Sequence, residues 1–280
     1  MKDYNFAGQV ALITGGSRGL GQAFAQALAR TGAQVALVAR SESQLQAVCQ
    51  TIEQAGGHAL AFAADVTDQE AIEGIVAGIE KQWGIIDLLI NSAGVFRALG
   101  PIVEVDPEEW WREVEINVRG TYLCARAVLP GMLARHQGRI INLVSAAGLQ
   151  SLPTTSAYCV GKTALIRLTE SLALETGDRG IRVFAMHPGT VRTPMSDYVV
   201  ESAEIKERAP LVQQWFQQLY YNAADTPIER SVELMMFLAS GGADVLSGRF
   251  IDVGDDHEAM LQRSAIIERD DLYTLRLRTS

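Results

Sequence analysis

The sequence predicts an α/β protein with a doubly wound, seven-stranded parallel sheet and helices on both faces. Short apolar runs recur along the chain, and several of them, such as VALIT, VALVA, DLLIN and RIINLVS, are apolar almost throughout. Such runs are typical of parallel strands that are covered on both faces. The longer segments between them carry apolar residues at three- and four-residue spacing, which is typical of helices. Alternating strands and helices favour one parallel sheet with right-handed crossovers.

The elements can be placed in order along the chain. Strands are predicted at residues 9–14, 34–39, 58–64, 86–91, 139–145, 181–187 and 249–253. The first three intervening helices end at Gly32, Gly56 and Gly84, where C-terminal caps belong. No internal repeat, low-complexity run or Pro/Gly/Ser linker divides the chain. Residues 1–253 are therefore predicted to form a single domain.

Composition excludes several classes of protein. With 48% hydrophobic and 20% charged residues, the chain is neither disordered nor collagen-like. A net charge of −9 lacks the basic surface of a general nucleic-acid binder, so no nucleic-acid partner is expected. The three cysteines and four histidines are widely spaced, which predicts neither a disulfide framework nor a metal site. No stretch approaches the ~20 apolar residues of a membrane span. We expect a reduced, cytoplasmic, metal-free protein with no membrane partner.

A glycine-rich turn follows the first predicted strand. The sequence TGGSRGLG occupies residues 14–21 and precedes an alanine-rich helix. A strand-to-helix turn of this kind lets backbone N–H groups and the helix N-terminus approach a diphosphate. The glycines are spaced as GxxxGxG rather than GxGxxG, and a tight turn that binds no ligand is the alternative. The position at the first strand–helix junction favours the dinucleotide site.

The end of the second predicted strand bears on which dinucleotide binds. An NAD site usually has Asp or Glu there for the ribose 2′-hydroxyl, but this chain has Ala39 followed by Arg40. Arg18 lies in the glycine-rich turn. Two guanidinium groups suit a 2′-phosphate, so NADP(H) is favoured over NAD(H). The alternative is that Arg40 is a solvated charge at a strand end.

Three polar residues form a candidate catalytic set. Ser145 ends the fifth predicted strand, at the sheet edge where ligands bind. Tyr158 and Lys162 lie one turn apart in a predicted helix, 156–176. The ammonium and an oxidised nicotinamide are expected to lower the phenol pKa, so that Tyr158 can act as an acid and base near neutral pH. The Ser145 hydroxyl can hold a substrate oxygen.

With these motifs the sequence resembles the short-chain dehydrogenase/reductase family in its single-domain, Rossmann-like form, from about residue 6 to residue 253. The matching motifs, in the family's order, are TGGSRGLG (14–21), Asp65-Val66, Asn91-Ser92-Ala93-Gly94, Asn117, Ser145, Tyr158 with Lys162, and Pro188-Gly189. Ser92 replaces the more usual second Asn of NNAG, and the chain departs from the usual VDGG-like turn at IDVGDD.

The resemblance implies a role for each matching residue. Tyr158 is implied as general acid and base, and Lys162 as the partner that binds the nicotinamide ribose. Ser145 is implied to orient the substrate carbonyl, and Asn117 to hold a water in the proton relay. The implied cofactor-binding residues are Gly15, Ser17, Arg18, Gly19, Leu20, Gly21, Arg40, Asp65, Val66, Asn91, Ala93, Gly94, Tyr158, Lys162, Pro188, Gly189, Thr190 and Thr193.

The implied function is an NADP(H)-dependent oxidoreductase that transfers hydride between nicotinamide and a carbonyl or secondary alcohol, such as a ketone or 3-oxoacyl reductase. The alternatives are an NAD-dependent alcohol or sugar dehydrogenase and a cofactor-binding regulatory or scaffold protein without catalysis. A family member without catalysis has little reason to keep Asn117, Ser145, Tyr158 and Lys162 together.

Two further segments are expected to shape specificity and assembly. Residues 193–227 are implied to form a substrate lid, whose aromatic residues either cover an uncharged carbonyl compound or simply pack on the core. The apolar helices 118–137 and 156–176 are implied to pair with their copies in a homodimer or homotetramer. The extension 254–280 carries leucines and isoleucines that need a surface, and we expect it to pack on an adjacent subunit.

Overall fold

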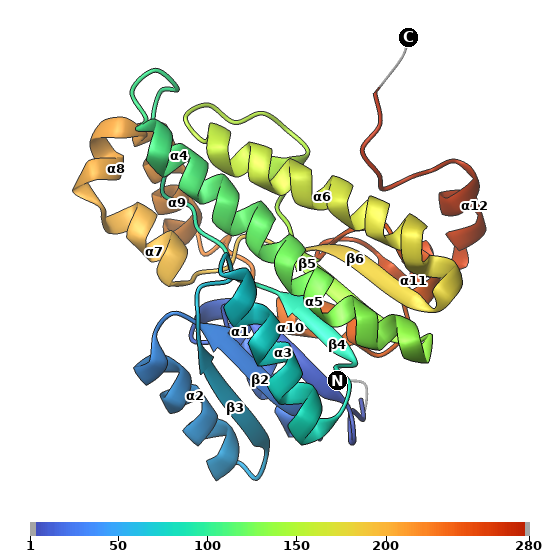
Figure 1. Ribbon diagram of the computed structural model, residues 1–280. Coiled ribbons are helices and arrows are strands. Elements are labelled where there is room, and N and C mark those ends of the chain that lie inside the picture. Colours follow the sequence, from blue (N-terminus) through green and yellow to red (C-terminus); the bar gives the residue numbers. More distant parts are fainter. Residues whose placement is uncertain (1–3, 278–280) are drawn as a thin grey trace.

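The computed structural model describes residues 4–277 and contains the predicted seven-stranded parallel sheet (Figure 1). Its strands lie in the order β3-β2-β1-β4-β5-β6-β7. Their bounds are β1 Val10–Thr14, β2 Gln34–Ala39, β3 His58–Ala63, β4 Leu88–Asn91, β5 Gly138–Leu143, β6 Ile181–His187 and β7 Phe250–Asp252. All neighbouring strands are parallel, and each predicted strand is present within two residues at either end. The predicted fold class is confirmed.

Helices cover both faces of the sheet, which explains the continuously apolar strands (Figure 1). One face is covered by α1 Gly19–Arg30, α2 Glu42–Gln54 and α10 Ile228–Ala239, which share an apolar core with β1 and β2. On the other face lie α3 Gln69–Trp83, α5 Gly120–Arg135 and α6 Ser156–Thr176. The α6 helix has the predicted bounds. The predicted helix 118–137 instead begins inside a continuous run formed by α4 Pro107–Val114, a π-helical turn Glu115–Arg119 and α5.

The strand order positions a ligand site. The chain runs outward from β1 through β2 to β3, and then resumes on the other side of β1 with β4. The loops that leave the carboxyl ends of β1 and β4 therefore diverge to opposite faces, which opens a crevice at that edge. The glycine-rich turn follows β1, and the Asn91-Ser92-Ala93-Gly94 motif follows β4.

The segment predicted to be a lid folds into three helices, α7 Pro194–Glu201, α8 Ala203–Arg208 and α9 Pro210–Tyr221. Their apolar side chains share a small core with the loop after β4. This cluster contains Phe96, Leu99, Val199, Ile205 and Ala209, with Tyr158, Met195, Tyr198, Val212 and Phe216 packed against it. The lid thus rests directly on the predicted catalytic tyrosine.

The C-terminal extension packs on its own chain. It contains α11 His257–Gln262 and α12 Ser264–Arg269, from which Met260 and Ile267 enter the core beneath α10. The Tyr273 carbonyl then accepts the N–H of Phe250 in the edge strand β7, at 2.9 Å. This chain's own core thus covers Met260 and Ile267, whereas Leu277 is 93% exposed. Packing of the extension on an adjacent subunit stays a prediction.

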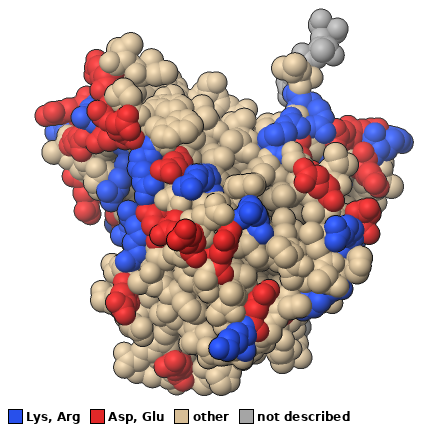
Figure 2. Space-filling model, in the orientation of Figure 1, with Lys and Arg blue, Asp and Glu red and all other residues tan. Residues whose placement is uncertain are grey.

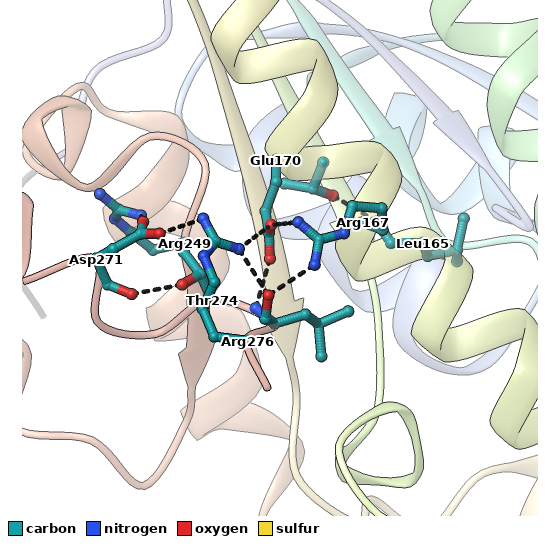
Figure 3. Close-up of polar contacts among 9 residues, drawn as sticks. Leu165, Arg167, Glu170, Arg249, Asp271, Thr274 and Arg276 are labelled. Carbon is teal, nitrogen blue, oxygen red and sulfur yellow. Dashed lines mark hydrogen bonds and ion pairs between the residues drawn. The ribbon is translucent and has the colours of Figure 1, made fainter. Parts of the chain in front are cut away.

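Charged groups hold the last described residues of the extension in place (Figure 3). Glu170 of α6 accepts the N–H of Leu275 at 2.7 Å and pairs with Arg276 at 2.9 Å. Asp271 pairs with Arg249, which precedes β7, at 2.8 Å. Leu275 lies against the apolar cluster that Phe250 shares with α6. The extension is therefore part of the folded domain.

The surface carries both signs of charge, and acidic and basic side chains are interspersed over the face that includes α4, α5 and α6 (Figure 2). Among the described helices, none combines the length and the apolar character that crossing a membrane requires. Within residues 4–277, no three His, Cys, Asp or Glu side chains are grouped so as to hold a metal ion.

Candidate active site

The glycine-rich turn is built for close approach of backbone to backbone. Gly15 and Gly19 have φ angles of +67° and +57°, a region that side chains rarely adopt. A Cβ on Gly15 would lie 2.9 Å from Ala93, and one on Gly21 would lie 2.4 Å from the Gly15 carbonyl oxygen. Glycine is therefore required at positions 15 and 21. The turn also lies directly at the N-terminus of α1, where free N–H groups favour an anion.

A cavity of about 410 Å³ runs from this turn to the predicted catalytic residues. Fifteen of the predicted site residues line it, namely Gly15, Ser17, Arg18, Gly19, Leu20, Gly21, Arg40, Asp65, Val66, Ala93, Gly94, Tyr158, Lys162, Pro188 and Thr193. The structure thus gathers residues from seven separate parts of the sequence around one cavity. Arg18 and Arg40 line it together with Ser41 and Gln44, near the end of β2.

Five predicted site residues do not line the cavity. Asn91 is buried beneath it and donates its side-chain N–H to Asn142 Oδ1 at 2.9 Å. Gly189 and Thr190 are held against Thr226, whose N–H donates to the Thr190 carbonyl at 2.8 Å. Ser145 is not among the lining residues, but its side chain lowers the pKa of Tyr158. The fifth, Asn117, lies completely buried in the π-helical turn.

The side chain of Asn117 holds a loop rather than presenting a free amide. Its Oδ1 accepts the N–H of Val95 at 3.0 Å, and its Nδ2 donates to the Val95 carbonyl at 3.0 Å. Both polar ends of the side chain are therefore bonded to Val95, and the role of Asn117 in holding a water stays a prediction.

Twelve lining residues are not among the predicted site residues. These are Val38, Ala39, Ser41, Gln44, Ala64, Ser92, Val95, Ile116, Leu143, Val144, Pro194 and Met195. Pro194 and Met195 belong to the predicted lid, and most of the others are neighbours of predicted residues and could have been found by extending each motif by one or two positions. Gln44, in the first turn of α2, has no such signal.

Asp65 is paired across the mouth of the cavity. Arg112 of α4 donates to its carboxylate at 2.5 Å, and the Thr67 hydroxyl donates to it at 2.8 Å. Although burial opposes it, these hydrogen bonds and the nearby Arg112 and Arg40 charges lower the pKa of Asp65. The carboxylate is therefore ionised at neutral pH and fixed in position.

Groups of the protein itself raise the pKa of Tyr158. Burial is the largest cause, the Glu113 carboxylate raises the pKa further, and Ser145 lowers it in part. Lys162 Nζ lies 5.5 Å from the centre of the Tyr158 ring and donates to the Leu143 carbonyl at 2.8 Å. The lowering of this pKa by Lys162 together with an oxidised nicotinamide stays a prediction.

Lys162 is itself buried beside the cavity. Burial lowers the pKa of Lys162 to about 8, and the charge of Glu113 partly opposes this. A Cβ on Gly94 would lie 3.7 Å from Lys162 Nζ and 2.9 Å from Asn117 Oδ1, so glycine is required where the β4 loop passes these two side chains. The ammonium is thereby held at the cavity that Arg40 also lines.

The residues present fit a nicotinamide dinucleotide. The glycine turn leaves a backbone cradle that a Cβ would fill, which suits a diphosphate. Hydroxyl and guanidinium donors line the same cavity as Tyr158 and Lys162. This donor set matches a ligand with a phosphate-rich middle and a reactive ring at one end.

The comparisons with known proteins agree with this assignment. Residues 9–204 match the short chain dehydrogenase family. A short chain dehydrogenase of Pseudocercospora fijiensis is 34% identical over 284 residues, covering 96% of this chain and 89% of the relative. The 2-(S)-hydroxypropyl-CoM dehydrogenase 3 of Xanthobacter autotrophicus is 36% identical over 241 residues, covering 86% of this chain and 92% of the relative.

Solved structures show the same likeness. The crystal structure of levodione reductase aligns with a TM-score of 0.81 and 29% identity, over 91% of this chain and 99% of that one. NAD⁺-bound xylitol dehydrogenase aligns with a TM-score of 0.80 and 29% identity, over 88% of this chain and 98% of that one. The fold, the cavity and these matches together place the chain in the short-chain dehydrogenase/reductase family of nicotinamide-dependent oxidoreductases.

Proposed function

We propose that this oxidoreductase is an NADP(H)-dependent reductase of uncharged ketones or 3-oxoacyl-type carbonyl compounds. The observation that carries the proposal is the cavity itself, which is lined both by Arg18 and Arg40, which follow β1 and β2, and by Tyr158 with Lys162 of α6. Residues 1–253 form the catalytic domain in this proposal, with the lid at 193–227, and the extension 254–280 is the segment fastened to it.

The cofactor supplies the hydride, and this chain positions the carbonyl and moves the proton. The Ser145 side chain, which lowers the pKa of Tyr158, holds the carbonyl oxygen beside the phenol. Tyr158 then gives its proton to that oxygen as negative charge develops on it. Lys162, at the same end of the cavity, supplies a positive charge and ammonium donors for the ribose hydroxyls.

Reduction uses a protonated Tyr158. A reductase needs a proton donor at this position, and the raised pKa of Tyr158 keeps that donor present at neutral pH. Oxidation of an alcohol would use the phenolate.

The preference for NADP(H) rests on Arg18 and Arg40. Both line the cavity, and Ser17, Ser41 and Gln44 add further donors there. Asp65 is the acidic residue in the lining, and its carboxylate already accepts hydrogen bonds from Arg112 and the Thr67 hydroxyl. A 2′-phosphate would find guanidinium partners rather than a carboxylate here.

The lid favours an apolar substrate. Met195 lines the cavity, and Tyr198 and Phe216 pack beside it in the cluster that contacts Tyr158. The Phe96 ring centre lies 4.5 Å from that of Tyr158. Apolar walls around the phenol suit a carbonyl compound without charged groups near the reacting carbon.

Steady-state kinetics with a panel of carbonyl compounds tests the proposal. Turnover of at least one uncharged ketone or 3-oxoacyl thioester is expected, with a higher kcat/KM for NADPH than for NADH. A higher kcat/KM with NADH would reject the cofactor assignment. A clear preference for small charged substrates would reject the substrate class.

We also propose a homodimer or homotetramer that uses the face formed by α4, α5 and α6. Apolar side chains are exposed on this face, including Trp111, Tyr122, Val160 and Leu174, and Leu174 is 86% exposed. The helices α5 and α6 lie side by side there (Figure 1). A patch of this kind usually marks an interface between chains.

Tyr122→Arg is expected to weaken the assembly, because a guanidinium would be buried without a partner at the centre of this face. Sedimentation velocity should then show a shift toward the 30.4 kDa monomer. Leu211→Arg on the lid, where the side chain is 72% exposed, is the matched control and should leave the mass unchanged. A wild-type monomer would reject the proposed assembly outright.

A further inference from the structure

A buried carboxyl group lies beside the site without a place in the mechanism given above. Glu113 belongs to α4 and only 2% of it is exposed. Its Oε2 accepts two successive backbone N–H groups, from Arg97 at 2.6 Å and from Ala98 at 2.9 Å. Its Oε1 is buried and has no hydrogen-bond partner among the residues that the structure describes. Such a group is costly to bury, so its contacts must be accounted for.

Glu113 and Asn117 lie one turn apart and hold the same loop. Asn117 bonds both the N–H and the carbonyl of Val95, and Glu113 bonds the N–H groups of Arg97 and Ala98. The residue between these two anchor points is Phe96. The loop after β4 is thus fastened on both sides of one aromatic side chain.

This loop joins the lid to the helix that carries Tyr158. The Phe96 ring centre lies 4.5 Å from that of Tyr158 and 6.4 Å from that of Phe216 in α9. Three residues later, Leu99 enters the lid core, while Ala98 packs with Ala157, the neighbour of Tyr158. Figure 1 shows α4 between the lid helices and α6. A shift of residues 96–99 would therefore move the lid and the catalytic helix relative to each other.

We propose that Glu113 is a positioning residue of the reductase, which holds residues 96–98 so that Phe96 stays against Tyr158 and shapes the substrate side of the cavity. This inference rests on the proposed function. A carboxylate suits the task because one oxygen can accept two converging N–H groups of consecutive residues. Aliphatic side chains at this position would leave both buried N–H groups unsatisfied.

The charges near Glu113 support an electrostatic contribution. Burial raises the pKa of Glu113, and the two backbone N–H groups and the ammonium of Lys162 oppose that rise. Burial raises the pKa of Tyr158, and Glu113 raises it further, whereas Ser145 lowers it. Glu113 thus acts on the proton donor in addition to holding the loop.

Three substitutions separate geometry from charge. Glu113→Gln keeps an oxygen that can accept both N–H groups but removes the charge. Glu113→Asp keeps the charge but withdraws the carboxylate by about 1.5 Å, the length of one carbon–carbon bond. Glu113→Leu removes both. Glu108→Gln, at an exposed position of the same helix, is the matched control.

The measurements are kcat and KM for the best carbonyl substrate, the Kd of NADPH, the pH profile of kcat/KM and hydrogen–deuterium exchange in residues 92–100. We expect Glu113→Asp and Glu113→Leu to raise KM and to lower kcat/KM by about tenfold or more, because small misplacements at a reacting centre are costly. Both substitutions should also speed hydrogen–deuterium exchange in residues 92–100. Glu113→Gln should keep KM within about threefold of the wild type and should keep exchange in this segment slow. The alkaline limb of its kcat/KM profile, which the phenol sets, should move to lower pH, because the charge that raised the Tyr158 pKa is lost.

Several outcomes would overturn the proposal. If folded Glu113→Leu and Glu113→Asp keep wild-type KM and wild-type exchange, the loop does not depend on this carboxyl group. If Glu113→Gln loses as much activity as Glu113→Leu, geometry is not what Glu113 provides. Should Glu113→Leu not fold, the contrast between Asp and Gln decides. The exchange readout needs no turnover, so an enzyme that reduces no carbonyl compound would reject the proposed function without deciding the role of Glu113 in holding the loop.

Discussion

Tyr158→Phe is expected to lower kcat for carbonyl reduction by about 10³-fold, because it removes the hydroxyl that donates the proton and leaves the aromatic ring in place. The ring that remains can still pack against Phe96, whose centre lies 4.5 Å away. The variant should therefore fold and bind NADPH with a Kd within about threefold of the wild type while turnover is lost. Stopped-flow absorbance at the NADPH band and cofactor fluorescence titration measure the two quantities.

The matched control for this substitution is Tyr273→Phe, which removes the same hydroxyl from an exposed position in the C-terminal extension. It should leave kcat unchanged. Activity of Tyr158→Phe within tenfold of the wild type would show that another group delivers the proton. Loss of NADPH binding along with turnover would indicate that the hydroxyl serves the cofactor rather than the carbonyl.

Arg40→Asp is expected to reverse the cofactor preference. The side chain lines the cavity at the end of β2, where a 2′-phosphate would gain a guanidinium partner and a ribose 2′-hydroxyl would gain an acceptor from Asp. The guanidinium of Arg40 would attract the 2′-phosphate, of charge about −2, whereas an Asp carboxylate would repel it. Arg40→Asp should therefore lower kcat/KM for NADPH by about 10²-fold, and kcat/KM for NADH should rise. The ratio of the two kcat/KM values, measured on one substrate, is the readout.

Arg263→Asp makes the same change in net charge at an exposed position between α11 and α12. It should leave the ratio unaltered, which separates a local contact from a general effect of charge on an anionic ligand. If Arg40→Asp leaves the ratio of kcat/KM for NADPH to kcat/KM for NADH within twofold of the wild type, Arg40 does not set the cofactor preference. Arg18 would then be the residue that remains to account for it.

The predicted strands were found within two residues at either end, because continuous apolar runs have few alternatives to burial between two layers of helices. The cofactor turn was also accessible, since Gly15 and Gly21 lie where any side chain would collide with the backbone. Tyr158 and Lys162 share a helix face through a spacing that can be read directly from the sequence. Local geometry decides all three features.

Features that depend on two distant segments were not predictable in the same way. The spacing of Arg112 and Asp65 along the chain says nothing about their ion pair, and nothing in either segment predicts that the Tyr273 carbonyl accepts the N–H of Phe250 in β7. The groups that act on Tyr158 are a third example. Lys162 was expected to act on the phenol, and the tertiary structure adds the Glu113 carboxylate, which raises the pKa of Tyr158.

By itself, therefore, the sequence determined the sheet, the glycine turn and the catalytic helix of this protein, because each depends on residues close together in the chain. Only the tertiary structure decided what surrounds the phenol. Glu113 reads as an ordinary helical glutamate until α4 packs beside the loop after β4 and two buried N–H groups converge on it. Burial and charge at a site are sums over neighbours from many segments, and those neighbours are assigned by packing rather than by sequence order.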